Sequence, residues 1–338
     1  MKFATKLTIL LLTIVTSSSL VLSYLVYISN VRTLEEEIKT KMEYRATLVM
    51  DTVDRFMYER MSDIVSLSTR ILYLLEKPDV TPRMITEDLI EYRNVNKNYV
   101  SLSYFDINRV RVADTSGTEI GQTHLTGKYW EELLKGEASI AKHVELAESL
   151  GVPVIFFAIG VKNDEGKLLG AIVARVPVAK LYEITRLALG TGKESEYIKI
   201  DLVNKDGLLL YSNYNRAGML KEKGGYCKDM EKILAGKKSN SGICSLDNSV
   251  FEVVAKERGY LDFAGNGWTL ILTMPRNEIF APAIELRNKL VIVAFFVMIL
   301  SIVISLTFAR SFSQPLIRLS QAADKIGHGD MSVRVDVR

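Results

Sequence analysis

Two long apolar segments interrupt an otherwise mixed pattern of hydrophobic and polar positions. Residues 7–31 contain no acidic or basic side chain, and residues 290–309 (LVIVAFFVMILSIVISLTFA) run for twenty residues without a charge. An α-helix rises about 1.5 Å per residue, so each segment can cross the roughly 30 Å core of a bilayer. We therefore expect transmembrane helices at residues 7–31 and 287–309. The alternatives are a cleaved signal peptide for the first segment and a buried core helix for the second.

Apolar residues recur at helical spacing after the first apolar segment, with charged residues between them. No proline occurs before Pro78 and no glycine before Gly117, so nothing in the sequence interrupts a helix there. The pattern predicts one long stalk helix and, after the prolines, a second helix over residues 82–95. The apolar stripe of the stalk needs a partner, either the rest of the domain or a second subunit. The stripe consists of Leu34, Ile38, Val49, Val53, Phe56, Ile64, Leu67, Ile71 and Leu74.

From residue 99 the pattern changes from helical spacing to alternation. Five β-rich segments follow, and residues 126–135 between them keep a helical pattern. The same order then returns, because residues 197–204 (YIKIDLVN) stand 98 positions after residues 99–106 (YVSLSYFD). Such a repeat predicts an α+β fold with two similar antiparallel-sheet lobes along one stalk. The first five β-rich segments are 99–106, 110–114, 140–146, 152–161 and 168–178.

Composition and charge narrow the possible partners. Of the 338 residues, 48% are hydrophobic and 25% charged, which is ordinary for folded protein. The formal net charge is +3 without long basic runs, so we expect no nucleic-acid partner. Lys2 and Lys6 precede the first apolar segment, and Arg310 and Arg318 follow the second; such flanking charges tend to stay in the cytoplasm. We therefore expect residues 32–287 to lie outside the cytoplasm, with the chain embedded in the lipid of the cytoplasmic (inner) membrane.

The two cysteines, Cys227 and Cys244, both fall in this outer segment. An oxidising compartment permits a disulfide between them, and the alternative is two buried free thiols. Two histidines, His124 and His143, lack a partner ligand at metal-binding spacing. The sequence also has no GxSxG, HExxH, CxxCH or P-loop pattern. We therefore expect no metal, no cofactor and no catalytic residue in this chain.

The order of these features resembles that of a known family. A membrane span, an unbroken stalk helix, two tandem α+β lobes, a second span and a Pro-Leu-x-x-Leu helix resemble the double Cache class of bacterial and archaeal receptors, chemoreceptors included. The resemblance covers essentially the whole chain. It implies two PAS-like lobes. The membrane-distal lobe, residues 99–190, is expected to bind a small molecule, and the membrane-proximal lobe, residues 191–286, to link it to the second span.

Residues 313–330 (SQPLIRLSQAADKIGHGD) resemble the first half of a HAMP linker. Pro315 sits where the first turn of a helix tolerates proline, and Gly329-Asp330 ends the helix. Four apolar residues between them are spaced 3, 4, 3 like the a and d positions of a heptad, and so narrow a seam is buried only in a bundle. We therefore expect a homodimer; the alternative is an amphipathic helix lying on lipid. The seam residues are Leu316, Leu319, Ala323 and Ile326.

The predicted segments follow from these features. We expect the chain to be a truncated piece of a longer receptor, with a cytoplasmic signalling module after residue 338. The segments are a cytoplasmic N-terminus (1–6), a transmembrane helix (7–31), the stalk and second helix (32–98), two lobes (99–190 and 191–286), a second transmembrane helix (287–309) and the start of a HAMP domain (310–338).

The resemblance also points to residues of the distal lobe that would bind the ligand. In the amino-acid-binding branch of the family, an Arg-x-Trp-Tyr element on a short helix holds the ligand carboxylate, and an Asp on a late strand holds its ammonium group. Here Lys128 and Trp130 occupy the basic and aromatic positions, with Tyr129 between them and Glu131 in place of the tyrosine. Arg175 stands where the Asp would be.

This exchange reverses the charge demand of the pocket. Arg175 is flanked by apolar strand residues (AIVARVPV), and a buried guanidinium needs an anion, which it binds in a bidentate manner. Lys128 adds to this preference, and the aromatic rings of Tyr129, Trp130 and Phe157 can cover an apolar or planar body. We therefore expect a small anionic ligand, an organic acid and not an α-amino acid. The alternative is that Arg175 faces solvent or pairs internally, with Asp114 or Glu145.

The whole pattern predicts a sensory and transmembrane receptor. Ligand binding would favour one arrangement of lobe and stalk, and the two spans would pass the displacement to the HAMP helix as rigid rods. A methyl-accepting chemotaxis receptor is the first expectation, by analogy. The alternatives are the sensor of a histidine kinase or a diguanylate cyclase, or a membrane-anchored outer enzyme or adhesin.

Overall fold

The computed structural model describes residues 3–124, 128–135, 139–147, 151–190, 192–224, 241–247, 249–308 and 314–328. The chain divides into two compact units. One unit is Lys39–Glu278, and the other combines Met1–Ile38 with Ile279–Arg338. Both sheets belong to the first unit.

Helix α1 (Phe3–Leu75) is continuous, as the absence of glycine and proline predicts. Within the Lys39–Glu278 unit its apolar stripe is buried, so the rest of the domain supplies the partner that the stripe requires. Helix α2 (Pro82–Val95) has the predicted bounds. The Oγ1 atom of Thr81 caps it by accepting a hydrogen bond from the backbone N–H of Met84 at 3.3 Å. The buried stripe of α1 consists of Met42, Ala46, Val49, Met50, Val53, Phe56, Met57, Ile64, Leu67, Ile71 and Leu74.

The distal lobe is a five-stranded antiparallel sheet with the strand order β2-β1-β5-β4-β3. Its last strand, β5, therefore lies in the middle of the sheet between β1 and β4. Helix α3 (Lys128–Leu134) lies in the connection from β2 to β3. The strands are β1 (Ser101–Asp106), β2 (Arg111–Asp114), β3 (Ser139–Ala147), β4 (Val152–Lys162) and β5 (Leu168–Pro177).

The proximal lobe repeats this topology, with the strand order β7-β6-β10-β9-β8. Ser103 pairs with Asp114 in the distal sheet, and Asp201 pairs with Ser212, each 98 positions later, in the proximal sheet. A β-bulge follows at the same place in both strand pairs. The predicted duplication and the α+β fold are thereby confirmed. The strands are β6 (Lys199–Val203), β7 (Leu209–Ser212), β8 (Ser241–Asp247), β9 (Val250–Lys256) and β10 (Thr269–Pro275).

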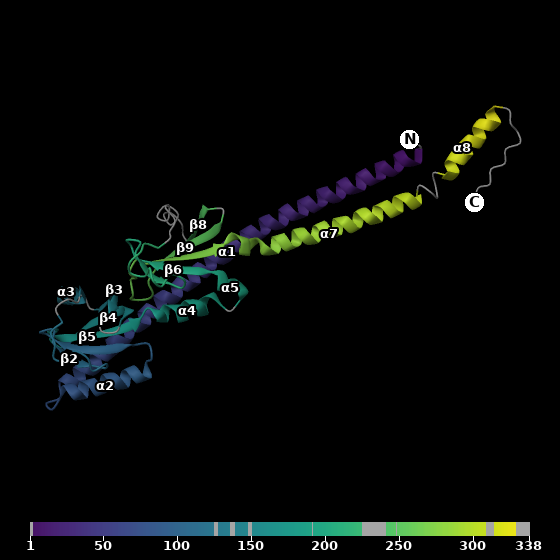
Figure 1. Ribbon diagram of the computed structural model, residues 1–338. Helices are drawn as coiled ribbons and strands as arrows, with labels where there is room; N and C mark the ends of the chain where they lie inside the picture. The colour runs from purple at the N-terminus through teal and green to yellow at the C-terminus, as the bar shows by residue number, and fades with distance from the viewer. Residues whose placement is uncertain are drawn as a thin grey trace. The chain divides into compact units, whose positions relative to one another are not determined.

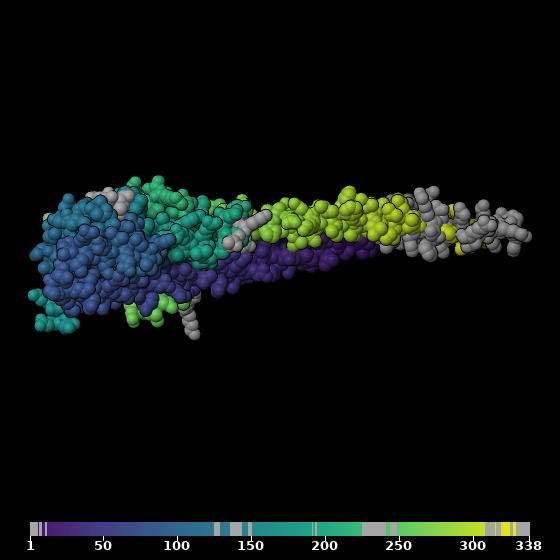
Figure 2. Space-filling view, turned by 90° about the horizontal axis from the view of Figure 1, so that it is seen from below, coloured from purple at the N-terminus to yellow at the C-terminus, as the bar shows by residue number. Residues whose placement is uncertain are grey.

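Helices cover both faces of the distal sheet. Figure 1 shows α2 on one side of this sheet and α3 on the other. From the side drawn in Figure 2, the surface of the distal lobe is formed largely by α1 and α2, in blue. Helices α4 (Ala179–Leu189) and α5 (Lys193–Tyr197) connect the two lobes. The face under α3 is the one that carries the candidate site.

The last strand of the proximal lobe leads straight into the second apolar helix. Strand β10 ends at Pro275, and helix α7 (Arg276–Phe308) begins at the next residue. Helices α1 and α7 are each long and apolar enough to cross a membrane. Helix α8 (Gln314–Gly327) covers the predicted HAMP-like stretch.

Candidate ligand-binding site

Arg175 lies on the central strand β5 of the distal lobe. It pairs with Ser101 on β1 and with Phe156 on β4, and residues directly opposite each other in antiparallel strands share a face. Arg175 is only 4% exposed, and its Nη1 atom donates to the hydroxyl oxygens of Ser101 at 2.8 Å and Ser103 at 3.0 Å. Arg175 is therefore a buried cation and does not face solvent.

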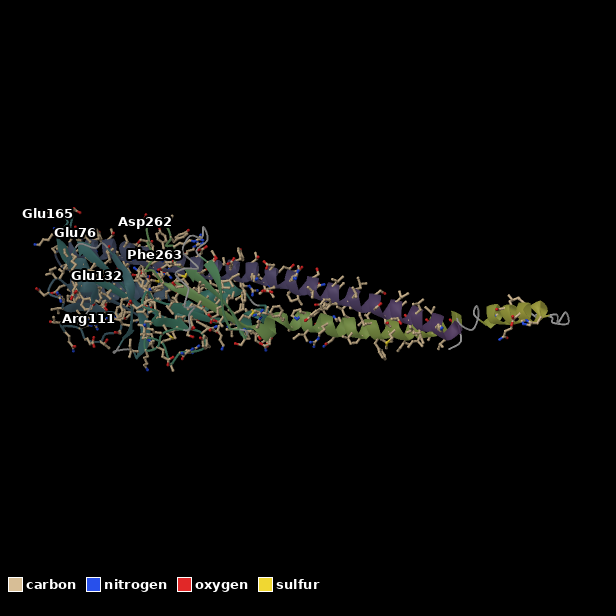
Figure 3. The ribbon with its side chains drawn as sticks, turned by 90° about the horizontal axis from the view of Figure 1, so that it is seen from above. Glu76, Arg111, Glu132, Glu165, Asp262 and Phe263 are labelled. Carbon is tan, nitrogen blue, oxygen red and sulfur yellow. The ribbon has the colours of Figure 1, made fainter. Side chains whose placement is uncertain are left out.

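A second arginine is buried on the same face. Arg111 of β2 is 2% exposed, and its Nη1 atom lies 2.7 Å from Oε2 of Glu119 and 3.2 Å from the carbonyl oxygen of Thr118. The bulge between β1 and β2 sets Arg111 opposite Phe105, and the guanidinium lies 5.3 Å from the centre of that ring. Figure 3 labels Arg111 among the side chains of the distal lobe.

One buried carboxylate, Asp114, serves both guanidiniums. Its Oδ2 atom lies 3.8 Å from Nη1 of Arg175 and 3.9 Å from Nη1 of Arg111. Its oxygens already accept hydrogen bonds from the hydroxyl of Ser103 and from the hydroxyl and backbone N–H of Ser116, the last at 2.7 Å. Burial, and after it the positive charge of Arg111, lowers the pKa of Arg175. Arg111 thus has a direct carboxylate partner in Glu119, whereas Arg175 reaches the carboxylate of Asp114 only at 3.8 Å, beyond hydrogen-bonding distance.

Four buried polar atoms around this cluster have no hydrogen-bond partner among the described residues. They are Nε of Arg111, Nδ1 of His124, the hydroxyl of Tyr129 and Nε1 of Trp130. An unpaired buried polar group costs roughly 1–3 kcal/mol, so such a concentration favours a bound polar molecule as the missing partner.

The ionisation of two of these groups follows from their burial. Burial raises the pKa of Tyr129 to about 12, so its phenol keeps its proton and can donate. Burial, and then the charges of Arg111 and Arg175, lowers the pKa of His124, so its imidazole is neutral near pH 7. The cluster thus combines two guanidiniums with neutral groups that can donate a hydrogen bond.

Aromatic rings join these polar groups into one surface. The ring of Phe105 lies edge-on to those of His124 and Trp130, with centroids 5.6 and 6.2 Å apart. Tyr129 stacks on Phe156 at 6.3 Å, and the guanidinium of Arg175 lies 5.6 Å from the Phe156 ring centre. Such a surface suits a small molecule that carries an anionic group on an apolar or planar body.

Three of the five predicted ligand-binding residues come together here. Tyr129 and Trp130 of α3 are buried against the face that carries Arg175. Lys128 begins α3, but its side chain lies outside the described part of the chain.

Phe157 does not join this group. It pairs with Ala174, so it points to the opposite face of the sheet, towards the side of α1 and α2. Its neighbour Phe156, directly opposite Arg175, takes the predicted place. The physical reason is the two-residue period of a strand, by which a one-residue difference moves a side chain to the other face.

Two residues of the cluster, Arg111 and His124, are absent from the sequence-based prediction. For Arg111 a signal exists, because it is a charged residue inside a β-rich apolar segment, as Arg175 is. For His124 no such signal exists, because no pattern in the sequence links it to β2.

The structure describes only some of the predicted disulfide and HAMP residues. Cys227 lies outside the described residues, and Cys244 lies in β8 without a described side chain, so the disulfide remains a prediction. Pro315 occupies the first turn of α8, as expected. The heptad seam also remains a prediction. Its members Leu319 and Ala323 are exposed in this single chain, and the side chains of Leu316 and Ile326 are outside the described set.

Two tandem antiparallel-sheet lobes on one long helix, followed by a second apolar helix, define the architecture of a membrane-associated sensor. The family model of the Cache domain (dCache_1) matches residues 30–283, and the chain therefore belongs to this family. The HAMP domain model matches residues 307–338. Cache and HAMP domains are sensory and signalling domains, so the chain is a sensor and this portion is not an enzyme.

Solved structures share the fold at low sequence identity. The ligand-binding domain of the Campylobacter jejuni chemoreceptor Tlp3 in complex with 4-methylisoleucine matches with a TM-score of 0.55 and 16% identity, covering 73% of this chain and 94% of that one. The ligand-binding domain of the Pseudomonas fluorescens chemoreceptor CtaA in complex with L-serine matches with a TM-score of 0.53 and 12% identity, covering 72% and 99%. No curated protein matches the sequence.

Proposed function

We propose that this chain is the sensor of a transmembrane receptor whose distal lobe binds a small organic acid. The observation that carries the proposal is the buried guanidinium of Arg175, which reaches the carboxylate of Asp114 only at 3.8 Å and lies on the same face as Arg111, itself paired with Glu119. A ligand carboxylate on this face would give Arg175 a direct anionic partner, since a carboxylate can accept two N–H bonds from one guanidinium.

The charge balance favours an organic acid over an α-amino acid. An ammonium group would need an acceptor, but Oδ1 of Asp114 already accepts two hydrogen bonds from Ser116, and Oδ2 accepts one from Ser103 and lies within 4 Å of both guanidiniums. Two of the four unpartnered groups are hydrogen-bond donors: the indole N–H of Trp130 can only donate, and the hydroxyl of Tyr129 can donate. Both can donate to a ligand carboxylate. The two solved structures described above contain 4-methylisoleucine and L-serine, which each have a carboxylate. We propose that the present site also binds a carboxylate but not an ammonium group.

Signal transfer would use the direct connection between β10 and α7. A ligand that binds one arrangement of the lobes more tightly shifts the population towards it. Helices that cross a membrane must keep their backbone hydrogen bonds, so α7 would transmit the change as a rigid element to the HAMP segment. We propose a methyl-accepting chemotaxis receptor as the output, with a histidine kinase or diguanylate cyclase as the second candidate.

We further propose that the chain acts as a homodimer in the inner membrane, with residues 32–287 on the outer side. The positive flanks at Lys2, Lys6, Arg310 and Arg318 support this orientation. Apolar side chains along both membrane-length helices are exposed in the single chain, which supports contact with lipid. Trypsin added to intact spheroplasts should cleave at exposed lysines of the two lobes such as Lys167 and Lys205; cleavage at these sites only after lysis would contradict the orientation.

The ligand class is tested with the full chain in detergent micelles. Acetate, pyruvate, succinate, L-alanine and L-serine are each added, and the melting temperature and the recovery of unchanged compound are measured. We expect saturable stabilisation by at least one of the acids without an ammonium group, and no product. The shift should disappear in Arg175→Ala and persist in Lys167→Ala, which removes an exposed lysine of the same lobe.

Three results would contradict this proposal. An unchanged shift in Arg175→Ala would remove Arg175 from the site. Stabilisation by the amino acids alone would overturn the ligand class. Turnover of the added compound would favour an enzyme over a receptor.

A further inference from the structure

The proximal lobe carries a charged group at the positions that form the distal site. The matching residues lie about 98 positions apart in the sequence and occupy the same places in the two strand ladders. The distal lobe has two buried arginines on this face, whereas the proximal lobe has two buried acids, at the positions that hold Ser103 and Phe156 in the distal lobe. The matching pairs are Ser103 and Asp201, Asp114 and Ser212, Phe156 and Glu252, and Arg175 and Thr273.

Asp201 and Glu252 lie on one face of the proximal sheet, on the two strands that flank β10. Asp201 pairs with Ile271, and Glu252 pairs with Thr273, two residues further along the same strand. Residues two apart in a strand point to the same side, so both carboxyls share this face. The same face also carries a buried apolar cluster that includes Val254 and Ile271.

Each carboxyl is buried with one oxygen satisfied and one oxygen left over. Asp201 is 3% exposed, and its Oδ2 atom accepts a hydrogen bond from the Tyr214 hydroxyl at 2.7 Å. Glu252 is 7% exposed, and its Oε1 atom accepts one from the Thr273 hydroxyl at 3.3 Å. The other oxygens, Oδ1 of Asp201 and Oε2 of Glu252, have no partner among the described residues.

The electrostatics of this face call for a cation. Burial raises the pKa of both Asp201 and Glu252, and the negative charge of Asp201 raises that of Glu252 further. Two lysines also lie on this face, and Lys199 pairs with Thr273 across β10 from Glu252, where its positive charge partly offsets the rise in the pKa of Asp201. Lys256 is exposed, and the ammonium of Lys199 lies 4.9 Å from the Tyr214 ring centre. A bound cation would restore the charge balance between the two carboxyls.

We propose that the proximal lobe holds a second ligand site, and that this site binds a small organic ammonium ion between Asp201 and Glu252. An ammonium group has three N–H donors and no acceptor, which matches two carboxylate oxygens that lack donors. Within the described residues no group of three or more His, Cys, Asp or Glu side chains is placed to hold a metal ion, which favours an organic cation. A cavity of about 660 Å³ is lined in part by Lys199 and Tyr214, and Tyr214 is the residue whose hydroxyl donates to Asp201.

This second site is independent of the proposed distal function, because it uses other residues and a ligand of opposite charge. The full chain in detergent at pH 7.5 is titrated with methylammonium, ethylammonium and ethanolamine chlorides, with sodium and calcium chlorides as references. Calorimetry and the melting temperature report binding. We expect saturable binding of at least one amine, with affinity at least tenfold weaker in Asp201→Asn and in Glu252→Gln.

The variants also serve as folding controls. Both replace a buried carboxyl by an amide of the same shape, so we expect them to melt no lower than the unmodified chain without ligand. Asp206→Asn changes an exposed turn carboxyl of the same lobe and should leave the affinity unchanged. Arg175→Ala should keep the amine response even though it loses the response to organic acids. Thr273→Lys would place an ammonium beside Glu252 and should abolish amine binding.

Several outcomes would overturn the assignment. Calcium binding without amine binding would make this a metal site. An equal amine affinity in Asp201→Asn and Glu252→Gln would place the ligand elsewhere. If no amine binds and both amide variants merely raise the melting temperature, the carboxyls form a protonated pair without a ligand.

Discussion

The two lobes are attached to the same helix α1 by different chemistry. At the distal lobe, Asp63 of α1 accepts hydrogen bonds from the Tyr99 hydroxyl at 2.6 Å and from Nε of Arg60 at 2.8 Å. The Tyr92 hydroxyl donates to the backbone carbonyl of Asp63 at 3.3 Å. The negative charge of Asp63 is therefore balanced by Arg60 on the preceding turn of the same helix.

The proximal attachment includes two buried acids, Asp54 and Glu257. Asp54 of α1 accepts hydrogen bonds from the backbone N–H groups of Arg258 and Gly259 at 3.0 and 3.1 Å. The neighbouring Glu257 accepts from the backbone N–H groups of Asn266 and, at 2.9 Å, Trp268. Burial raises the pKa of Asp54 and raises that of Glu257 to about 7, and the charge of Asp54 adds to the latter.

The difference shows that one helix can bind one lobe through a contact that is independent of pH and the other through a contact that depends on pH. The distal contact is made by tyrosine hydroxyls that donate to Asp63, whose charge is compensated by Arg60 within α1, whereas the proximal contact includes acids whose protonation depends on pH. The lobe with the pH-dependent contact is the proximal lobe, which leads directly into α7. The comparison yields three predictions.

The largest effect is expected from Asp54→Ala. This change leaves the two backbone N–H groups of residues 258 and 259 buried without an acceptor, at roughly 1–3 kcal/mol each. We expect the free energy of unfolding of the lobes to fall by about 4 kcal/mol. Chemical denaturation of the full chain in micelles measures this change. Asp54→Asn keeps an acceptor and should lose far less; an equal loss in both variants would show that the charge, and not the hydrogen bonds, holds the lobe.

The second effect is a pH dependence due to Glu257. Its pKa rises from 4.5 in the unfolded chain to about 7 in the fold, so in this window the folded protein holds a proton that the unfolded chain releases. The contribution to stability is complete below about pH 4.5 and is lost as the pH rises through about 7. It amounts to at most about 3 kcal/mol.

Melting temperatures of the full chain between pH 5 and 8.5 check this prediction. Glu257→Gln should flatten the profile in this range and melt higher than the unmodified chain at pH 8. A profile that rises with pH, or one that the substitution leaves unchanged, would rule out Glu257 as its source.

The smallest effect is expected at the distal attachment, from Tyr99→Phe. The change removes one hydrogen bond to Asp63, which still accepts from Arg60. We expect a loss of about 1 kcal/mol. Burial, together with the hydrogen bond to Asp63, raises the pKa of Tyr99 far above its ordinary value, so this loss should be the same at pH 5 and pH 8.5. A loss that grows with pH would mean that the two attachments are coupled.

The sequence by itself determined the elements and their duplication. The helical spacing of the stalk, the Thr81-Pro82 start of α2 and the 98-residue repeat are local or periodic properties, and all appear as predicted. Arg175 was also identified from the sequence, because a charge within a run of apolar strand residues is visible without any partner.

Only the tertiary structure decided which side chains share a face. Alternation alone puts Arg111 and Asp114 on opposite faces, since they lie three positions apart, but the bulge beside Phe105 turns Arg111 to the side of Arg175. Because side chains alternate between the two faces of a strand, Phe156 and not the predicted Phe157 lies on the face of Arg175. The hydrophobic period and the order of the elements depend on residues that are close in the sequence. Strand register and β-bulges depend on pairing between strands that are distant in the chain. For that reason, the cluster of two arginines is visible only in the folded protein.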